Sequence, residues 1–450
     1  MVVVFWSLVC PLRGGEARST PDLNRLDARN LTPAQWRKIE AEVAAGRGQA
    51  VVSLLEKVIL GWYNDWNPAV DALAKVDPAR TLTLLTAEMG DKNDYRRTQC
   101  IAALGRLGPA AAPAVGALTE AVSQPLTGSN AVEALGKIGP AAAESAPAIA
   151  RWLENPELRV DEQVRGCLAL GQITGEADAQ VDPLARLLDV PGEKALNYRA
   201  DTLKAIGALA PGSRRALPAV AAVLNEPKIS HTERAWAAWC LGQFGAEARG
   251  AAPDLKRAMN EDPYDNVRAG AILALQKVGA ADFDVPQALE QSRDRDYQEQ
   301  LRKYPEADAA ARPYTRDLPP VTRVEIYALG GASAKSPRRL KSRQGGFPIR
   351  PYKLCQEITA HRTLTGAEAE EVAAAWRKLR VAMGYQMMCH FPVVGLRFYG
   401  GQKGQLLLET SVCFGCQNFY VKDGWFGFDA KHATGQEFAA LTRRLLPPQE

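Results

Sequence analysis

Two cysteine-containing motifs near the C-terminus have the residue types for metal chemistry. Cys413 and Cys416 are separated by two residues, and the adjacent pair Cys389 and His390 lies about 24 residues earlier. Thiolates and a neutral imidazole in this combination can complete a tetrahedral shell around Zn²⁺. The sequence therefore predicts Cys389, His390, Cys413 and Cys416 as candidate zinc ligands, and zinc is the cofactor it suggests.

The same motifs allow three other interpretations. The pair Cys413 and Cys416 could be a redox dithiol, it could form a structural disulfide if the chain is exported, or both thiols could simply be buried. A c-type haem is excluded, because Gln417 stands where that group requires histidine. Adjacent side chains diverge on an extended segment, so the fourth zinc ligand is open. The alternative ligands are His361, His432 and Cys355.

Arginine and tryptophan residues in the middle of the chain are candidate binding residues. The arginines recur at similar places in a repeated phrase: Arg97, Arg165, Arg199, Arg234 and Arg268. Guanidinium groups along one edge could bind carboxylates or phosphates, or each could pair with nearby acids such as Asp94 and Asp265. Trp236 and Trp239 could form a binding hot spot or a base-stacking surface, or they could pack against a neighbouring repeat.

A repeat of about 35 residues organises these positions. One marker is a phrase ending in Leu/Ile-Gly, with its glycines at Gly105, Gly136, Gly171, Gly207 and Gly242. A second marker is a proline with the same spacing, at Pro78, Pro113, Pro147, Pro183, Pro218, Pro253 and Pro286. The proline suits the first turn of one helix, and the glycine lets a second helix approach its neighbour. The pattern predicts about seven helix pairs stacked in an all-α solenoid over residues 50–295, because neither helix could bury its apolar face alone.

The repeated phrases resemble HEAT repeats. Val164 to Gly171 (VRGCLALG) and Val267 to Leu275 (VRAGAILAL) look like the second helix of such a repeat, and the short Ala-Gly-Pro-rich form resembles the bacterial subgroup named after phycobilisome lyases. The resemblance covers about half of the chain and implies an armadillo-like superhelix with a binding surface. Proteins with such repeats include scaffolds, chromophore lyase subunits and base-excision enzymes, so the resemblance implies no single function.

A different module follows the repeat. Alternating residues predict strands at 321–329, 395–399, 405–413, 418–421 and 425–428. Capping-box patterns predict helices that follow Thr365 and Thr434. We expect an N-terminal capping helix in 20–49, a linker at 296–320 and a small α+β domain over 321–450. A segment with seven basic residues, 335–353, suits an anionic partner or a solvated loop.

Composition limits the function classes. The 450 residues are 46% apolar with a formal net charge of +4, which fits a globular protein and disfavours nucleic-acid binding. The apolar segment 1–19 resembles a degenerate export signal, and we favour the cytoplasm over export. No catalytic motif is recognisable, so we name no catalytic residue. The sequence favours a non-catalytic scaffold for a protein or peptide, with a metal or dithiol tail domain, a lyase-like chromophore function and nucleic-acid binding as alternatives.

Overall fold

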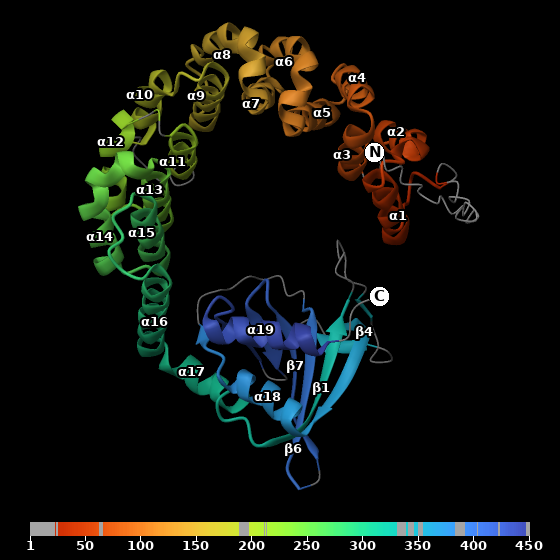
Figure 1. Ribbon diagram of the computed structural model, residues 1–450, viewed down its shortest axis with the longest axis vertical. Coiled ribbons are helices and arrows are strands. Elements are labelled where there is room, and N and C mark those ends of the chain that lie inside the picture. The colour runs from red at the N-terminus through yellow and green to blue at the C-terminus, as the bar shows by residue number, and fades with distance from the viewer. Residues whose placement is uncertain are drawn as a thin grey trace, which may run out of the picture. The chain divides into compact units, whose positions relative to one another are not determined.

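Consecutive helices fill most of the chain, and a curled antiparallel sheet follows them (Figure 1). The computed structural model describes residues 23, 26–62, 66–188, 198–210, 212, 214–330, 339–340, 346–349, 354–382, 392–402, 404–421 and 424–446. The chain divides into two units, residues 1–187 and residues 188–450. The predicted signal segment and most of the basic segment 335–353 lie outside the described residues.

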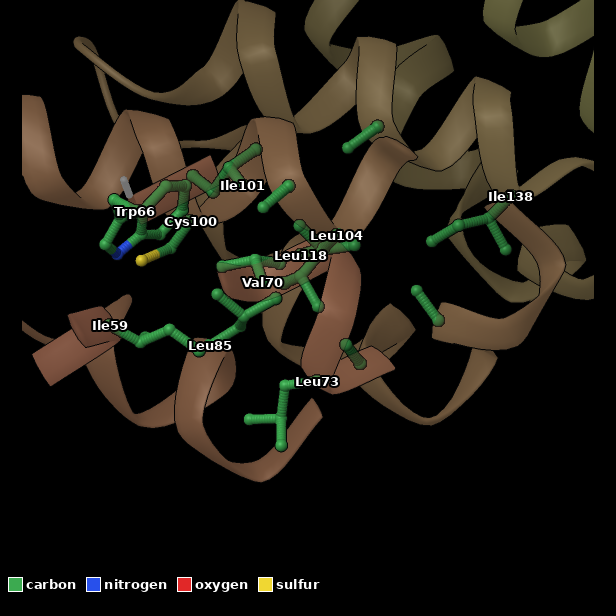
Figure 2. Close-up of a cluster of buried hydrophobic side chains, with 14 of the residues drawn as sticks. Ile59, Trp66, Val70, Leu73, Leu85, Cys100, Ile101, Leu104, Leu118 and Ile138 are labelled. Carbon is green, nitrogen blue, oxygen red and sulfur yellow. The ribbon is translucent and has the colours of Figure 1, made fainter. Parts of the chain in front are cut away.

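The first unit consists of helices joined by short 3₁₀ turns. Its helices are α1 (Pro33–Ala44), α2 (Val52–Leu60), α3 (Trp66–Val76), α4 (Pro78–Glu88), α5 (Asp94–Leu107), α6 (Val115–Val122), α7 (Gly128–Ile138), α8 (Ala146–Leu153), α9 (Val160–Thr174) and α10 (Ala177–Leu188). The apolar faces of α1 to α9 form one continuous core. Figure 2 shows a part of it, where Trp66, Val70, Leu104 and Leu118 point into the space between the helices.

The marker glycines have the predicted role, and five of the seven marker prolines do. A Cβ atom on Gly105 would lie 2.9 Å from the Cα of Ala134, and one on Gly136 would lie 2.9 Å from the Cα of Ala169. Glycine is therefore needed where α5, α7 and α9 pack closely. Marker prolines lie in the first turn of α4, α8, α12, α14 and α16, whereas Pro183 lies inside α10 and Pro113 in the 3₁₀ turn before α6.

Residues 94–122 are long and apolar enough to cross a membrane by length and composition. They comprise α5, a 3₁₀ turn and α6. Cys100, Leu104 and Leu118 from this segment are fully buried in the core of the first unit. A buried core helix can be as long and as apolar as a membrane-spanning helix. Burial in the core of the first unit therefore explains why this segment is apolar.

The second unit continues the helical repeat and then changes character. Its helices are α11 (Tyr198–Ala208), α12 (Leu217–Asn225), α13 (His231–Gln243), α14 (Ala252–Glu261), α15 (Asp265–Lys277), α16 (Val285–Lys303) and α17 (Pro305–Ala311). Much of the segment 296–320, expected as a linker, is helical: α16 continues into it as far as Lys303, and α17 follows. Buried Ser292 and half-buried Tyr297 explain why this charged sequence is helical, since one side of it packs on the protein.

The tail is an antiparallel sheet with two helices on one face (Figure 1). The strands are β1 (Val321–Leu329), β2 (Arg339–Leu340), β3 (Gly346–Ile349), β4 (Leu354–Thr365), β5 (Val381–Ala382), β6 (Val394–Gly400), β7 (Gln405–Cys413), β8 (Asn418–Val421) and β9 (Gly424–Phe428), in the order β2-β4-β1-β6-β7-β8-β9-β5 with β3 paired to β4. Helices α18 (Gly366–Arg377) and α19 (Ala433–Leu445) cover a core around Trp376, Phe398 and Phe419. The α+β prediction is confirmed.

Neither predicted capping box forms. Thr365 precedes α18 without a side-chain cap, and Glu368 accepts instead from the Arg362 guanidinium at 2.7 Å. Helix α19 begins one residue before Thr434, and its cap is His432, whose Nδ1 accepts from the Thr434 amide at 3.2 Å. His432 takes the place of the expected threonine because its side chain precedes the helix and accepts from the amide of the second helical residue, which has no partner within the helix.

Candidate functional site

The five candidate arginines all have partners inside their own unit. Arg234 forms two parallel hydrogen bonds to Asp262, at 3.0 and 3.1 Å. Arg199 donates to Glu233 at 2.9 Å, and Arg268 donates to the Ser292 hydroxyl at 2.9 Å. The other two are in the first unit: Arg97 pairs with Asp94, and Arg165 donates to Ser129. Glu233 and Ser292 lie on later helices and Asp262 directly follows α14, so the guanidiniums of Arg199, Arg234 and Arg268 join successive repeats.

The two candidate tryptophans contact each other and the preceding repeat. Trp236 and Trp239 meet edge to face with centroids 5.4 Å apart. Trp239 lies against α11, where a Cβ on Gly207 would come within 2.6 Å of its ring. The Lys204 ammonium, also on α11, lies 4.6 Å from the Trp236 centroid. Both rings are half-buried, which fits packing between repeats and leaves their binding role a prediction.

The candidate zinc ligands are only partly described. Cys413 and Cys416 are both buried, and the Cys416 amide donates to the Cys413 Sγ at 3.3 Å. Cys389 and His390 lie outside the described residues, so a zinc ion held by all four remains a prediction. The cysteines inside the solenoid have ordinary roles in packing, and burial raises the pKa of Cys100 to about 12 and of Cys167 to about 11.

A cavity of about 730 Å³ in the second unit brings functional side chains together. It is lined by α13, by the start of α15, by the second half of α16 and by residues of the tail domain. The lining includes His231, Tyr264, Asp265, Asn266, Asp296, Tyr297, Glu299, Tyr304, Gln417 and Lys431. This size is typical of ligand sites, in which aromatic walls bury the ligand and a few polar groups orient it.

Tyr264 is held in place and is nevertheless exposed. Its ring stacks on His231 with centroids 4.3 Å apart, and the Arg234 guanidinium lies 5.8 Å from its centroid. The backbone amide of Tyr264 donates to Asp262 at 3.0 Å. The residue is nonetheless 47% exposed. An aromatic ring that is fixed before binding loses little conformational entropy when a partner covers it.

The solenoid wall of the cavity carries carboxylates. Asp265 accepts from the Ser292 hydroxyl at 2.6 Å, and Asp296 accepts from the Gln300 amide at 2.9 Å. Burial and, after it, the neighbouring Asp265 raise the pKa of Asp296, although Arg268 opposes the shift. Glu299, one turn further along the helix, is exposed. The wall is therefore an aromatic and acidic surface that is partly shielded from water.

A group of three potential metal ligands lies beside this cavity. The Nε2 of His432 is 2.6 Å from Glu290 and 3.9 Å from Asp294. The Nδ1 of the same ring accepts from the Thr434 amide and therefore carries no proton in the neutral ring. The proton is then on Nε2, which donates to Glu290. Because Nε2 must be deprotonated to bind a metal, the geometry favours a hydrogen bond between α16 and the tail domain.

The sheet carries a polar network on the face opposite its helices. Glu325 accepts from the hydroxyls of Tyr327 and Tyr399 at 2.6 and 2.8 Å, and Arg397 donates to Tyr327 and Glu409. Burial would raise the pKa of Glu325, but the two hydroxyls and the arginines lower it below its usual value. The pKa of Tyr327 is raised to about 12 by burial and by Glu325. These five side chains therefore form one connected network of hydrogen bonds.

Sequence reasoning missed the cavity. Its walls come from separate helices and the tail, and only the fold brings them together. One signal was present, because His231 and Asn266 are 35 residues apart and therefore occupy equivalent places in consecutive repeats. Their side chains meet at 3.2 Å. Polar and aromatic residues that recur near the start of the second helix of a repeat could have indicated the wall of the cavity.

Comparison with known proteins identifies the repeat. Residues 195–276 match the model of HEAT repeats. Similar solved structures include an engineered protein (16% identity, 44% of this chain and 96% of that chain, TM-score 0.31) and human deoxyhypusine hydroxylase (18%, 58% and 95%, 0.25). Another is the complex of CpcE and CpcF of phycocyanin lyase from Nostoc sp. PCC7120 (20%, 61% and 99%, 0.34).

Similarities at these TM-scores carry no argument about function. No curated protein matches the chain. The matched segment covers α11 to α14 and all but the last residue of α15, and it contains Arg199, Arg234, Trp236 and Tyr264. The helix pairs and the marker glycines agree with this match, and residues 195–276 form HEAT repeats.

Proposed function

We propose that this protein is a non-catalytic scaffold whose HEAT-repeat solenoid binds a segment of a protein partner in the cavity around Tyr264. The observation that carries the proposal is a ring fixed by His231 and Arg234 that is still 47% exposed. Fixed, exposed aromatic residues beside polar groups are typical of binding hot spots. A second exposed ring, Tyr304, lines the same cavity.

The tail domain supports the proposal as a source of further contacts. Gln417, Asp429 and Lys431 contribute to the lining of the cavity. Gln417 has a φ of +54°, which non-glycine residues adopt rarely. Its carbonyl oxygen accepts from the Phe428 amide at 2.8 Å, so the turn after Cys416 is fixed by the sheet. A partner segment in the cavity would then meet both the solenoid and this turn.

Site-specific photo-crosslinking tests the proposal. A photo-reactive phenylalanine at position 264 should crosslink a discrete protein in an extract of the source organism. The purified partner should then bind the unmodified chain, and Tyr264→Ala should weaken binding about thirtyfold, because a hot-spot side chain contributes about 2 kcal/mol. Isothermal titration calorimetry measures this change.

Tyr95 provides the matched control. It is 67% exposed and lies on α5, outside the cavity. The same probe at position 95 should not enrich the partner, and Tyr95→Ala should leave the affinity unchanged. Equal crosslinking from both positions, or an affinity unaffected by Tyr264→Ala, would contradict the proposal.

A further inference from the structure

The chemistry of the cavity wall indicates what kind of side chain it takes. Two exposed tyrosines, Tyr264 and Tyr304, share the cavity with the carboxylates of Asp265, Asp296 and Glu299. The faces of aromatic rings attract cations, most strongly where water is partly excluded. Carboxylates beside such rings add charge and hydrogen-bond acceptors for an ammonium or guanidinium group.

The protein already uses this arrangement within its own fold. The Lys303 ammonium lies 5.4 Å from the Tyr304 centroid, and the Arg234 guanidinium lies 5.8 Å from the Tyr264 centroid. Arg234 is only 5% exposed, and His231 stacks on the same ring. Tyr264 nevertheless stays 47% exposed, and this exposed part is what a cation from a partner can contact.

The cations that line the cavity do not neutralise the acidic wall completely. Arg293 donates to the carbonyl oxygen of Lys431 and pairs with Glu290, at the side of the tail domain. Arg268 approaches Asp265 from the core at 3.6 Å, but four of its hydrogen bonds go to Ser292 and to the carbonyls of Asp262 and Pro263. The lining holds four carboxylates, those of Asp265, Asp296, Glu299 and Asp429, against the cations Arg293, Lys303 and Lys431, which leaves one negative charge in surplus.

We infer that the cavity binds a lysine or arginine side chain of the partner protein, with the cation between the ring of Tyr264 and the carboxylates of Asp296 and Glu299. The inference rests on the proposed function and specifies its partner as a basic segment. The aromatic ring contacts the flat or methylene part of the side chain, while the carboxylates accept from its nitrogen atoms. Asp265 positions this wall through Ser292 and Arg268.

Fluorescence anisotropy with the full chain tests the inference. The probe is a fluorescein-labelled Gly-Ser peptide that contains one arginine and one lysine, and its control has glutamine at both positions. The basic peptide should bind, and the glutamine peptide should bind at least tenfold more weakly. Glu299→Lys should weaken binding of the basic peptide about tenfold, because it replaces an attraction with a repulsion. Asp296→Asn should weaken it about threefold.

Glu306→Lys is the matched control for charge. Glu306 is exposed on α17, and the cavity does not include it. This variant changes the net charge as Glu299→Lys does, so it should leave binding unchanged. Equal weakening by both variants would show a bulk charge effect and overturn the inference, as would equal binding of the glutamine peptide. Competition with spermidine distinguishes a free polyamine from a protein side chain, and tighter binding of spermidine than of the peptide would also overturn the inference.

The outcome is separable from that of the photo-crosslinking experiment. If position 264 crosslinks a partner whose affinity depends on Tyr264 while the basic peptide does not bind, the inference fails and the proposed function stands. If the basic peptide binds with the expected variant pattern but position 264 enriches no protein over position 95, the scaffold proposal fails and the cavity is a cation site only.

Discussion

At the scale of single residues, buried arginines serve the solenoid as connections between repeats. Arg234 and Asp262 have side chains that are 6% and 10% exposed, and they meet in a two-point geometry. A charge that is removed from water in this way is costly unless its partner is present. The recurrence of arginine along the sequence predicted either a ligand ladder or internal pairs. The sequence could not decide between them, because both patterns place arginine at the same spacing.

Removal of one partner should therefore be costly. We expect Asp262→Ala to lower the free energy of unfolding by about 3–5 kcal/mol, since it leaves the Arg234 guanidinium buried without its carboxylate. Urea denaturation of the full chain measures the change. The control is Asp201→Ala, which breaks an exposed pair with Lys204 and should cost less than about 1 kcal/mol. If both variants lowered the free energy of unfolding by a similar amount, burial of the Arg234–Asp262 pair would not determine how much the pair stabilises the protein.

At the scale of elements, the repeat could be predicted well and the tail only in part. The solenoid could be predicted because the glycine and proline markers recur with the same period. Where one marker is missing or misplaced in a repeat, the markers of the other repeats still define the helix pair. Strand β4 was missed, because LCQEITAHRTLT has few apolar residues and its polar side chains alternate without a clear buried face. The cap of α19 was also missed, since histidine is an uncommon capping residue.

Close helix packing should make the marker glycines intolerant of a methyl group. A Cβ on Gly136 would meet Ala169 at 2.9 Å, so Gly136→Ala should lower the free energy of unfolding by about 1–3 kcal/mol. Gly116 in α6 has nothing within 4 Å, and Gly116→Ala should raise the same quantity by up to about 1 kcal/mol. Chemical denaturation of the two variants checks the opposite signs, and a neutral or stabilising Gly136→Ala would refute the packing role of the glycine.

At the scale of the molecule, the second unit combines the end of the solenoid with the tail domain through α16. Arg380 of the tail contacts Asp294, and its guanidinium lies 5.1 Å from the ring centroid of Tyr297. His432 donates to Glu290 on the same helix. These contacts could not be predicted, because each joins residues that are more than 80 positions apart. A helix was expected to begin at Pro286, but neither its extension to Lys303 nor the histidine cap was expected. The cavity depends on these contacts, because its lining includes residues of the solenoid and residues of the tail domain.

Loss of these two carboxylates should loosen the tail domain from α16. We expect the variant Glu290→Ala/Asp294→Ala to increase hydrogen exchange of the amides of residues 429–434 about tenfold, because two polar contacts of about 0.5–1 kcal/mol each are lost. The amides of β1, β6 and β7 should keep their protection, since the core of the sheet lies around Trp376 and Phe398. Glu299→Ala removes a carboxylate from the same helix without touching the tail contacts and should leave the exchange unchanged. Unaltered exchange in the double variant would mean that apolar packing alone holds this junction, and the histidine would then serve only as the cap of α19.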